Sequence, residues 1–261
     1  MSSTDRAYAV VTGASSGIGY HLAKECAEHG FDLLIAADEP SINDAAVSLR
    51  ASGAEVEPVE VDLATKEGVD LLYEATGGRP VAALLANAGH GLGGAFLDQS
   101  FDDIQHVIHT NVTGTLALIH KIGRDMVNRR DGRILITGSI AGLMPGTFQA
   151  VYNGTKALLD SFAFALRAEV KDSGVTVTCL MPGATETDFF ERADMLDTKV
   201  GTQKKQSPED VARSGFEAMM KGEGEIVTGW NNKLRVAISH IVPSSVLAEA
   251  HRREAAPGTS K

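Results

Sequence analysis

The sequence of 261 residues is short of cysteines, aromatic side chains and long apolar runs. Its two cysteines, Cys26 and Cys179, lie in apolar segments, which favours buried thiols in a reducing compartment, and they have no zinc-ligand spacing. Aromatic residues make up only 5% of the chain, so stacking platforms are not indicated. No apolar run reaches the ~18 residues of a membrane span. Met1–Tyr8 is short and polar, without the apolar core of a signal peptide, so we expect a cytoplasmic protein.

Positive charge is also scarce. The chain has 24 Lys and Arg against 34 Asp and Glu, a net charge of −10. Such a balance disfavours both nucleic acid and anionic membranes as partners. Apolar residues make up 43%, and a chain of this length can bury a large core without disulfides or metals. We therefore expect a globular protein that acts on a small molecule.

Short apolar runs alternate with segments of helical periodicity along the whole chain. Most of the runs are apolar on both faces, which indicates strands buried between two helix layers. No linker or change of composition appears before about residue 254. The sequence thus predicts one α/β domain over residues 1–254 and a flexible tail over 255–261. Long helices are expected over 102–130 and 152–172, and a helical segment broken at Pro243 over 234–253.

A glycine-rich loop, Thr12–Gly19, joins the first expected strand to the first expected helix. Gly13 permits the tight turn, Gly17 lets a pyrophosphate approach the backbone, and Gly19 allows the helix to pack closely on the strand. The free N–H groups at the helix start then face an anion, which the helix dipole also favours. A glycine-rich turn without a ligand is the alternative.

The same residues also fit a nucleophile elbow, the Gly-x-Ser-x-Gly turn of serine hydrolases, with Ser15 as nucleophile. An elbow needs earlier strands beside it, one of which leads to the oxyanion loop. Here the loop follows the first strand, so a hydrolase is disfavoured.

Asp38 stands at the end of the second expected strand, 19 residues after Gly19. A carboxylate there accepts hydrogen bonds from both adenosine ribose hydroxyls and repels a 2′-phosphate. No Lys or Arg occurs from Asp32 to Leu49 to neutralise that phosphate. Asp38 therefore favours NAD over NADP, with a turn or capping aspartate as the alternative.

Tyr152 and Lys156 lie four residues apart at the start of a helix, so they share one face. A neighbouring ammonium favours the phenolate and lowers the pKa of a tyrosine from ~10, which makes an acid/base for a carbinol oxygen. Ser139 ends a strand 13 residues earlier and can reach the same sheet edge. Asn111 lies inside a helix, which is unfavourable unless its amide has a specific partner. An ordinary amphipathic face is the alternative for the Tyr–Lys pair.

Together these motifs resemble the short-chain dehydrogenases/reductases of the single-domain type, over about residues 7–230. The motifs follow in the family's order: Thr12–Gly19, Asp62, Asn87–Gly89, Asn111, Ser139, Tyr152, Lys156 and Pro182–Gly183. The resemblance implies a doubly wound, Rossmann-type three-layer sandwich with a mostly parallel seven-stranded sheet. It also implies an NAD(P)-dependent oxidoreductase that interconverts a secondary alcohol and a ketone. Homotetramers and homodimers, formed through the two long helices, are typical of the family.

The resemblance assigns roles to single residues. Tyr152 is the general acid/base, Lys156 lowers its pKa and holds the nicotinamide ribose, and Ser139 binds the substrate oxygen. Asn111 holds a water that relays protons through Lys156. Besides Tyr152 and Lys156, the expected cofactor-binding residues are Gly13, Ser15, Ser16, Gly17, Ile18, Gly19, Asp38, Asp62, Leu63, Asn87, Ala88, Gly89, Thr110, Pro182, Gly183, Thr185 and Thr187. A regulatory protein that binds the nucleotide without turnover is the alternative, which the intact catalytic set disfavours.

In the family, either of two positions after the second strand sets the cofactor choice. Here Ala37 occupies the first and Asp38 the second, and the carboxylate of Asp38 again favours NAD.

The substrate side is expected to consist of residues 90–96, 140–149 and a lid over 184–206. The predicted lining residues are His90, Ile140, Met144, Gln149 and Phe189. An apolar wall suits a lipophilic or alicyclic alcohol or ketone, with simple lid packing as the alternative. Arg192 in the lid is either a clamp for an acidic substrate or a solvated charge.

His106 and His109, three residues apart, offer too few ligands for a metal ion, so no metal is expected. The segment over 234–253 is expected to cap the subunit core or the lid.

Overall fold

The computed structural model describes residues 6–239 and 241–260. A single seven-stranded sheet has the order β3-β2-β1-β4-β5-β6-β7, and every neighbouring pair is parallel. The strands are β1 Ala7–Thr12, β2 Phe31–Ala37, β3 Val56–Glu60, β4 Ala83–Ala86, β5 Gly132–Thr137, β6 Val175–Met181 and β7 Glu225–Val227. The expected doubly wound sheet is confirmed, and it is fully rather than mostly parallel.

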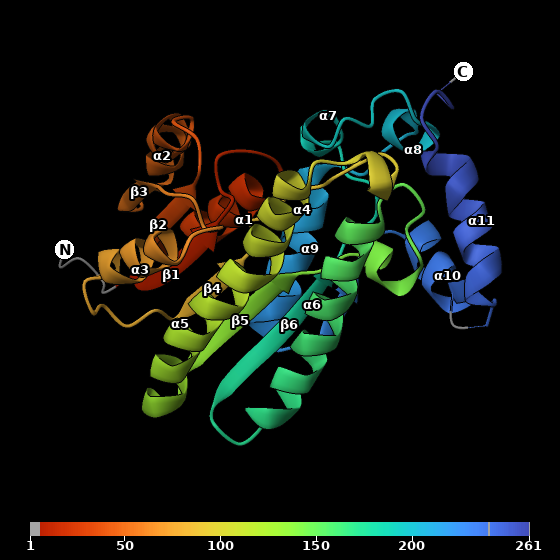
Figure 1. Ribbon diagram of the computed structural model, residues 1–261. Coiled ribbons are helices and arrows are strands. Elements are labelled where there is room, and N and C mark those ends of the chain that lie inside the picture. The colour runs from red at the N-terminus through yellow and green to blue at the C-terminus, as the bar shows by residue number, and fades with distance from the viewer. Residues whose placement is uncertain (1–5, 240, 261) are drawn as a thin grey trace.

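Helices connect these strands and extend the chain beyond the sheet (Figure 1). They are α1 Gly17–Glu28, α2 Ile42–Leu49, α3 Lys66–Ala75, α4 Phe101–Ile108, α5 Thr115–Arg129, α6 Ala150–Glu169, α7 Phe189–Arg192, α8 Lys199–Thr202, α9 Pro208–Lys221, α10 Trp230–Ser239 and α11 Ser244–Ala255. Short 3-10 turns lie at Arg50–Ser52, Phe96–Asp98 and Ile140–Leu143.

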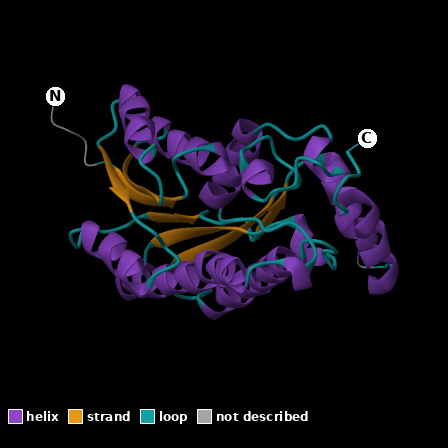
Figure 2. Cartoon of the chain, turned by 45° about the horizontal axis from the view of Figure 1, so that its top comes forward, coloured by secondary structure: helices purple, strands orange, loops and turns teal. Residues whose placement is uncertain are grey.

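The sheet lies between two helix layers, as Figure 2 shows. Buried residues of α1, α2 and α9, among them Leu22, Ile42 and Phe216, form one core with one face of the sheet. Residues of α3, α5 and α6, such as Leu118 and Leu159, form a second core on the other face. All seven residues of β2 are buried, and all but Asp32 are apolar, because helices cover the strand on both faces.

The long helix expected over 102–130 is interrupted. A π-helical segment, His109–Gly114, separates α4 from α5. This segment carries Asn111. At its last residue, Gly114, the backbone lies close to the loop that follows β3, so that a Cβ there would be 2.0 Å from the carbonyl oxygen of Leu63. π-Helical turns inside α-helices often mark functional sites, because they redirect side chains and free backbone groups.

The C-terminal helices cover one end of the molecule, where α11 lies beside α8 (Figure 1). Thr147 Oγ1 donates to the carbonyl of Ala248 over 2.8 Å, and His251 Nδ1 lies 2.9 Å from the carbonyl of Thr147. The chain after residue 254 differs from the expected free tail. Ala255 belongs to α11 and is 1% exposed, and the N–H of Gly258 donates to Asp197 Oδ2 over 2.7 Å. The C-terminal segment is therefore bound to the lid through its backbone N–H groups, and no sequence pattern predicts such contacts.

Within the described part of the chain, no helix has both the length and the apolar character needed to cross a membrane.

Candidate active site

A cleft lies along the carboxyl ends of the strands, where the order reverses between β1 and β4. In open parallel sheets this switch point is where ligands bind, because the loops on its two sides diverge. Every site residue predicted from the sequence lines this one cleft except Asn111. The predicted cofactor side and substrate side are thus brought together, over sequence separations of more than a hundred residues.

The glycine loop forms the floor of the cleft. Gly13 and Gly17 adopt φ angles of +64° and +55°, which favour glycine. At Gly19 a Cβ would lie 1.9 Å from the carbonyl oxygen of Gly13, so only glycine lets α1 start this close to β1. The loop and the N-terminus of α1 thereby form a cradle of backbone N–H groups that fits a dinucleotide pyrophosphate.

Asn87 ties three strand ends together beneath this cradle. Its Nδ2 donates to the carbonyl oxygens of Thr12 and Gly13, at 3.2 and 3.3 Å, and its Oδ1 accepts from Thr137 Oγ1 at 3.1 Å. Asn87 thus fixes the loop that follows β4, including Ala88 and Gly89, against the glycine loop.

Tyr152 and Ser139 meet at the other end of the cleft. Desolvation raises the pKa of Tyr152 to about 12, opposed by a hydrogen bond with Ser139. The direction corrects the sequence expectation of a lowered pKa. Lys156 Nζ lies over the Tyr152 ring, 5.9 Å from its centre, and donates one hydrogen bond to the carbonyl of Thr137 over 2.8 Å.

Lys156 is buried, with 4% of its surface exposed, and burial lowers its pKa to about 8. One turn further along α6 lies a residue that the sequence analysis missed, Asp160, which is 3% exposed. Burial raises the pKa of Asp160 to about 6, while its Oδ1 accepts from the N–H of Ser139 over 3.2 Å. The signal was present in the sequence, because Tyr152, Lys156 and Asp160 are spaced four apart and share one helix face.

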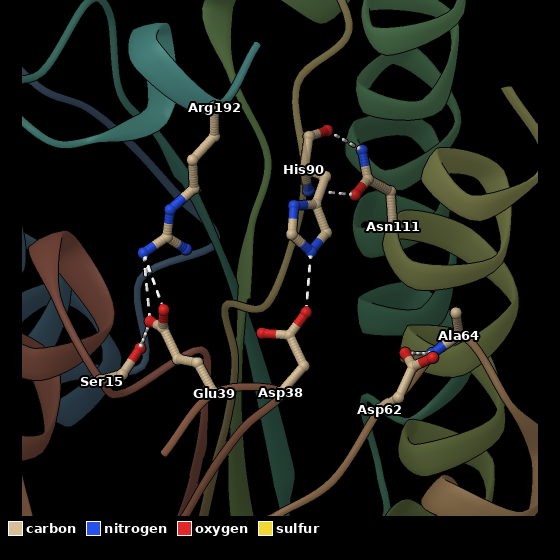
Figure 3. A network of polar contacts seen from close by, with 8 residues as sticks. All are labelled: Ser15, Asp38, Glu39, Asp62, Ala64, His90, Asn111 and Arg192. Carbon is tan, nitrogen blue, oxygen red and sulfur yellow. Dashed lines mark hydrogen bonds and ion pairs between the residues drawn. The ribbon is translucent and has the colours of Figure 1, made fainter. Parts of the chain in front are cut away.

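Asn111 is fully buried behind the cleft. Its Oδ1 accepts from the N–H of His90 over 2.7 Å, and its Nδ2 donates to the carbonyl of His90 (Figure 3). The same Nδ2 also donates to Thr155 Oγ1 over 3.0 Å. These bonds explain the polar residue inside a helix, because they fix the loop after β4 next to α6.

Two polar contacts connect the end of β2 with the opposite wall of the cleft, side by side in Figure 3. Asp38 Oδ2 lies 3.2 Å from His90 Nε2, and this contact lowers the pKa of Asp38. The neighbouring Glu39 binds Arg192 of α7, at 3.1 Å, and accepts from Ser15 Oγ. Arg192 therefore pairs with Glu39, a partner that neither sequence-based alternative included: these were a clamp for an acidic substrate and a solvated charge. Ser15 donates to a carboxylate rather than to a histidine, an arrangement unlike a hydrolase nucleophile.

Asp62 lines the cleft after the end of β3, where its Oδ1 accepts from the N–H of Ala64 over 2.8 Å (Figure 3). That contact holds the loop after β3 in place and orients the carboxylate.

The substrate side lies under α7. The ring of Phe189 lies 5.0 Å from that of Tyr152, centre to centre, and Phe190, Ala193 and Met195 form a small lid core. Residues from the C-terminal helices also line the cleft and were missed: Arg235, His251 and Glu254. No motif in the sequence marks these three residues.

Comparison with known proteins agrees with this geometry. Residues 7–197 match the family model of the short chain dehydrogenases. The chain belongs to the short-chain dehydrogenase family. It is similar to an uncharacterized oxidoreductase of Myxococcus xanthus, 29% identical over 255 residues, which are 94% of this chain and 96% of that protein.

Two solved structures of the family show the same fold. A short-chain dehydrogenase from Burkholderia phymatum in complex with NAD superimposes with a TM-score of 0.83 at 27% identity, covering 92% of this chain and 95% of that one. A short-chain dehydrogenase from Sphingobium yanoikuyae in complex with NADPH gives 0.80 at 25% identity, covering 91% and 96%. This short-chain dehydrogenase is an oxidoreductase, and its glycine cradle fits the dinucleotides that these relatives bind.

Proposed function

We propose that this short-chain dehydrogenase interconverts a secondary alcohol and a ketone with NAD as cofactor. The observation that carries the proposal is the convergence of Tyr152, Ser139 and Lys156 at one end of a cleft whose other end is the glycine cradle. Binding of a nucleotide without turnover does not require the hydroxyls of Tyr152 and Ser139 or the buried ammonium of Lys156 at this place.

When bound, the nicotinamide supplies or accepts the hydride. Tyr152 is a phenol at neutral pH, because its pKa is raised to about 12, and so it is ready to give a proton to a carbonyl oxygen. Ser139 orients that oxygen, since its own hydroxyl is fixed by the N–H of Ala141 at 3.1 Å. Lys156 has donors left beyond its bond to Thr137 and holds the nicotinamide ribose.

Asn111 supports the site without contacting the substrate. Its amide is occupied by His90 and Thr155, so its side chain positions the loop after β4 rather than touching substrate. The water relay from Asn111 through Lys156 stays a prediction from the family resemblance.

For the cofactor, Asp38 supports NAD over NADP. Its carboxylate is ionised at neutral pH, lines the cleft and accepts the two ribose hydroxyls. Arg192 is the one cation that contacts the end of β2 in the described residues, and Glu39 already neutralises it. The remaining cofactor contacts are those assigned to the glycine loop, Asp62, Leu63, Asn87–Gly89, Thr110 and residues 182–187.

For the substrate, the cleft wall supports a lipophilic alcohol or ketone. Ile140, Met144 and Phe189 line it, while Gln149 and His90 supply polar edges.

A homodimer or homotetramer is supported by the outer faces of the long helices. Leu158 and Phe164 of α6 are 43% and 41% exposed, and Val127 of α5 is 37% exposed, which is typical of a surface covered by a second subunit. A cytoplasmic location stays a prediction from the sequence.

The test is to screen ketones of increasing ring size with NADH and then to compare Tyr152→Phe with the wild type. The phenylalanine keeps the ring and removes the proton donor. We expect turnover to be lost and NADH binding to stay nearly unchanged. Comparable turnover by the variant would contradict the mechanism.

A further inference from the structure

Three metal-binding side chains meet at the adenosine end of the cleft. Asp38 follows β2, His90 follows β4, and His106 lies on α4. Their ligand atoms all lie within 4.8 Å of one another. Asp38 Oδ2 and His90 Nε2 are 3.2 Å apart, and the rings of His90 and His106 are 5.0 Å apart, centre to centre.

These distances suit a tetrahedral metal ion. Zinc binds imidazole nitrogen and carboxylate oxygen at ~2.0–2.2 Å, which places two ligands of one ion roughly 3.3 Å apart. The Asp38–His90 pair already has this spacing. His106 needs to move by roughly 1.5 Å at most, which small changes of its side-chain torsions allow at a helix surface. Two histidines and one carboxylate leave the fourth position open for water.

The ligand set also decides the class of metal. Imidazole favours zinc and its transition-metal neighbours, whereas magnesium and calcium prefer sets of oxygen ligands. The nearby positive charge is compensated, because Arg192 pairs with Glu39 at 3.1 Å and approaches Asp188 at 3.9 Å. Figure 3 shows this pair beside the Asp38–His90 contact and separate from it.

We propose that Asp38, His90 and His106 form a zinc-binding site, and that zinc bound there excludes the dinucleotide. The exclusion rests on the proposed function, in which the carboxylate of Asp38 accepts the ribose hydroxyls. A carboxylate oxygen that ligates zinc is no longer free for the ribose, so the two ligands compete. Zinc is thereby an inhibitor that acts at the cofactor end, away from Tyr152.

The experiment uses the full chain without a histidine tag. Calorimetric titration with zinc chloride alone, in the absence of dinucleotide, measures the site directly. Titration with NADH at several zinc concentrations, followed by nicotinamide fluorescence, measures the competition. Magnesium chloride is the control metal, and we expect it to have no effect on either measurement.

His106→Ala is the deciding variant, because His106 has no role in the proposed reaction. Changing a residue that only orients a metal ligand costs 10–100-fold in affinity, so losing a ligand should weaken zinc binding by at least about tenfold. NADH binding without zinc should stay unchanged. His109→Ala, an exposed histidine three residues further on, is the matched control and should behave as the wild type. His106→Gln serves as a second variant that keeps a polar side chain.

The outcomes separate the two proposals. One zinc per chain, lost in His106→Ala, with an apparent Kd for NADH that rises at least tenfold with zinc, supports the inference. Absence of zinc binding, or zinc binding that His106→Ala leaves unchanged, overturns the site. Zinc bound through His106 without any effect on NADH overturns the exclusion. If zinc binds through His106 but NADH does not bind at all, the site stands and the proposed function fails.

Discussion

The carboxylate of Asp160 supports the backbone of Ser139, whose N–H donates to Asp160 Oδ1 over 3.2 Å. Asp160 Oδ2 has no hydrogen-bond partner in the described part of the chain. The same carboxylate raises the pKa of Lys156 through its charge, against the larger effect of burial. Asp160 thus positions Ser139 and favours the protonated form of Lys156, two groups of the proposed mechanism.

Asp160→Asn should therefore change the pH dependence as well as the rate. Without the negative charge, the pKa of Lys156 falls further below about 8, so the loss of ketone reduction with rising pH begins at a lower pH than in the wild type. If that pKa falls by about one unit, kcat for reduction at pH 8 should fall about fivefold, because the protonated fraction of Lys156 drops from about a half to about a tenth. The measurement is a pH profile of kcat. Asp172→Asn, in the exposed turn after α6, is the control, and equal profiles for both variants would contradict a role for Asp160.

The two directions of the reaction should respond oppositely to pH. Oxidation needs the phenolate of Tyr152, and since its pKa is raised to about 12, the phenolate fraction grows about tenfold per pH unit. Oxidation should therefore accelerate from pH 7 upward. Reduction needs the phenol and should stay level until Lys156 loses its proton above about pH 8. Initial rates in both directions test this, and an oxidation rate that is level above pH 7 would mean that Tyr152 is already ionised.

Much of the fold could be predicted, because it follows from local patterns. The long helix expected over 152–172 is α6, Ala150–Glu169, because helical periodicity is a signal within a few residues. The π-helical segment at His109–Gly114 could not be predicted, because one extra residue per turn leaves the periodicity of a long helix almost unchanged.

The site was predictable where motifs carry it and unpredictable where distant residues meet. Glu39 and Arg192 are 153 positions apart. A count of basic residues near Asp38 in the sequence therefore could not find Arg192, which reaches the end of β2 from the lid. The direction of the Tyr152 pKa shift depends on burial and on the charge of Asp160, and a four-residue Tyr–Lys spacing shows neither.

Asp38→Ala should narrow the difference between the two cofactors. The variant loses the acceptor for the ribose hydroxyls and the repulsion of a 2′-phosphate, so NADH should bind about tenfold more weakly, consistent with the loss of charged hydrogen bonds. NADPH should bind more tightly. Fluorescence titration of both dinucleotides measures the change. Asp44→Ala, exposed in α2, is the control, and an unchanged preference in Asp38→Ala would show that Asp38 does not read the ribose.

Two glycine substitutions should change stability in opposite directions. A Cβ at Gly138 would lie 1.8 Å from Asp160 Oδ1, so Gly138→Ala forces the carboxylate away and should cost about 1–3 kcal/mol. Gly154 lies inside α6 with open space around it, so Gly154→Ala should stabilise the fold by roughly 0.5–1 kcal/mol. Urea unfolding measures both. Equal losses in the two variants would show that the contact with Asp160 is not what requires glycine at position 138.

The central claim is that the cleft is an NAD site formed by the glycine loop and Asp38. Titration of the purified protein with NADH and with NADPH, followed by nicotinamide fluorescence in zinc-free buffer, tests it most directly. We predict saturable binding of both, with NADH tighter. Tighter binding of NADPH would contradict the role of Asp38, and binding of neither would contradict the enzyme itself.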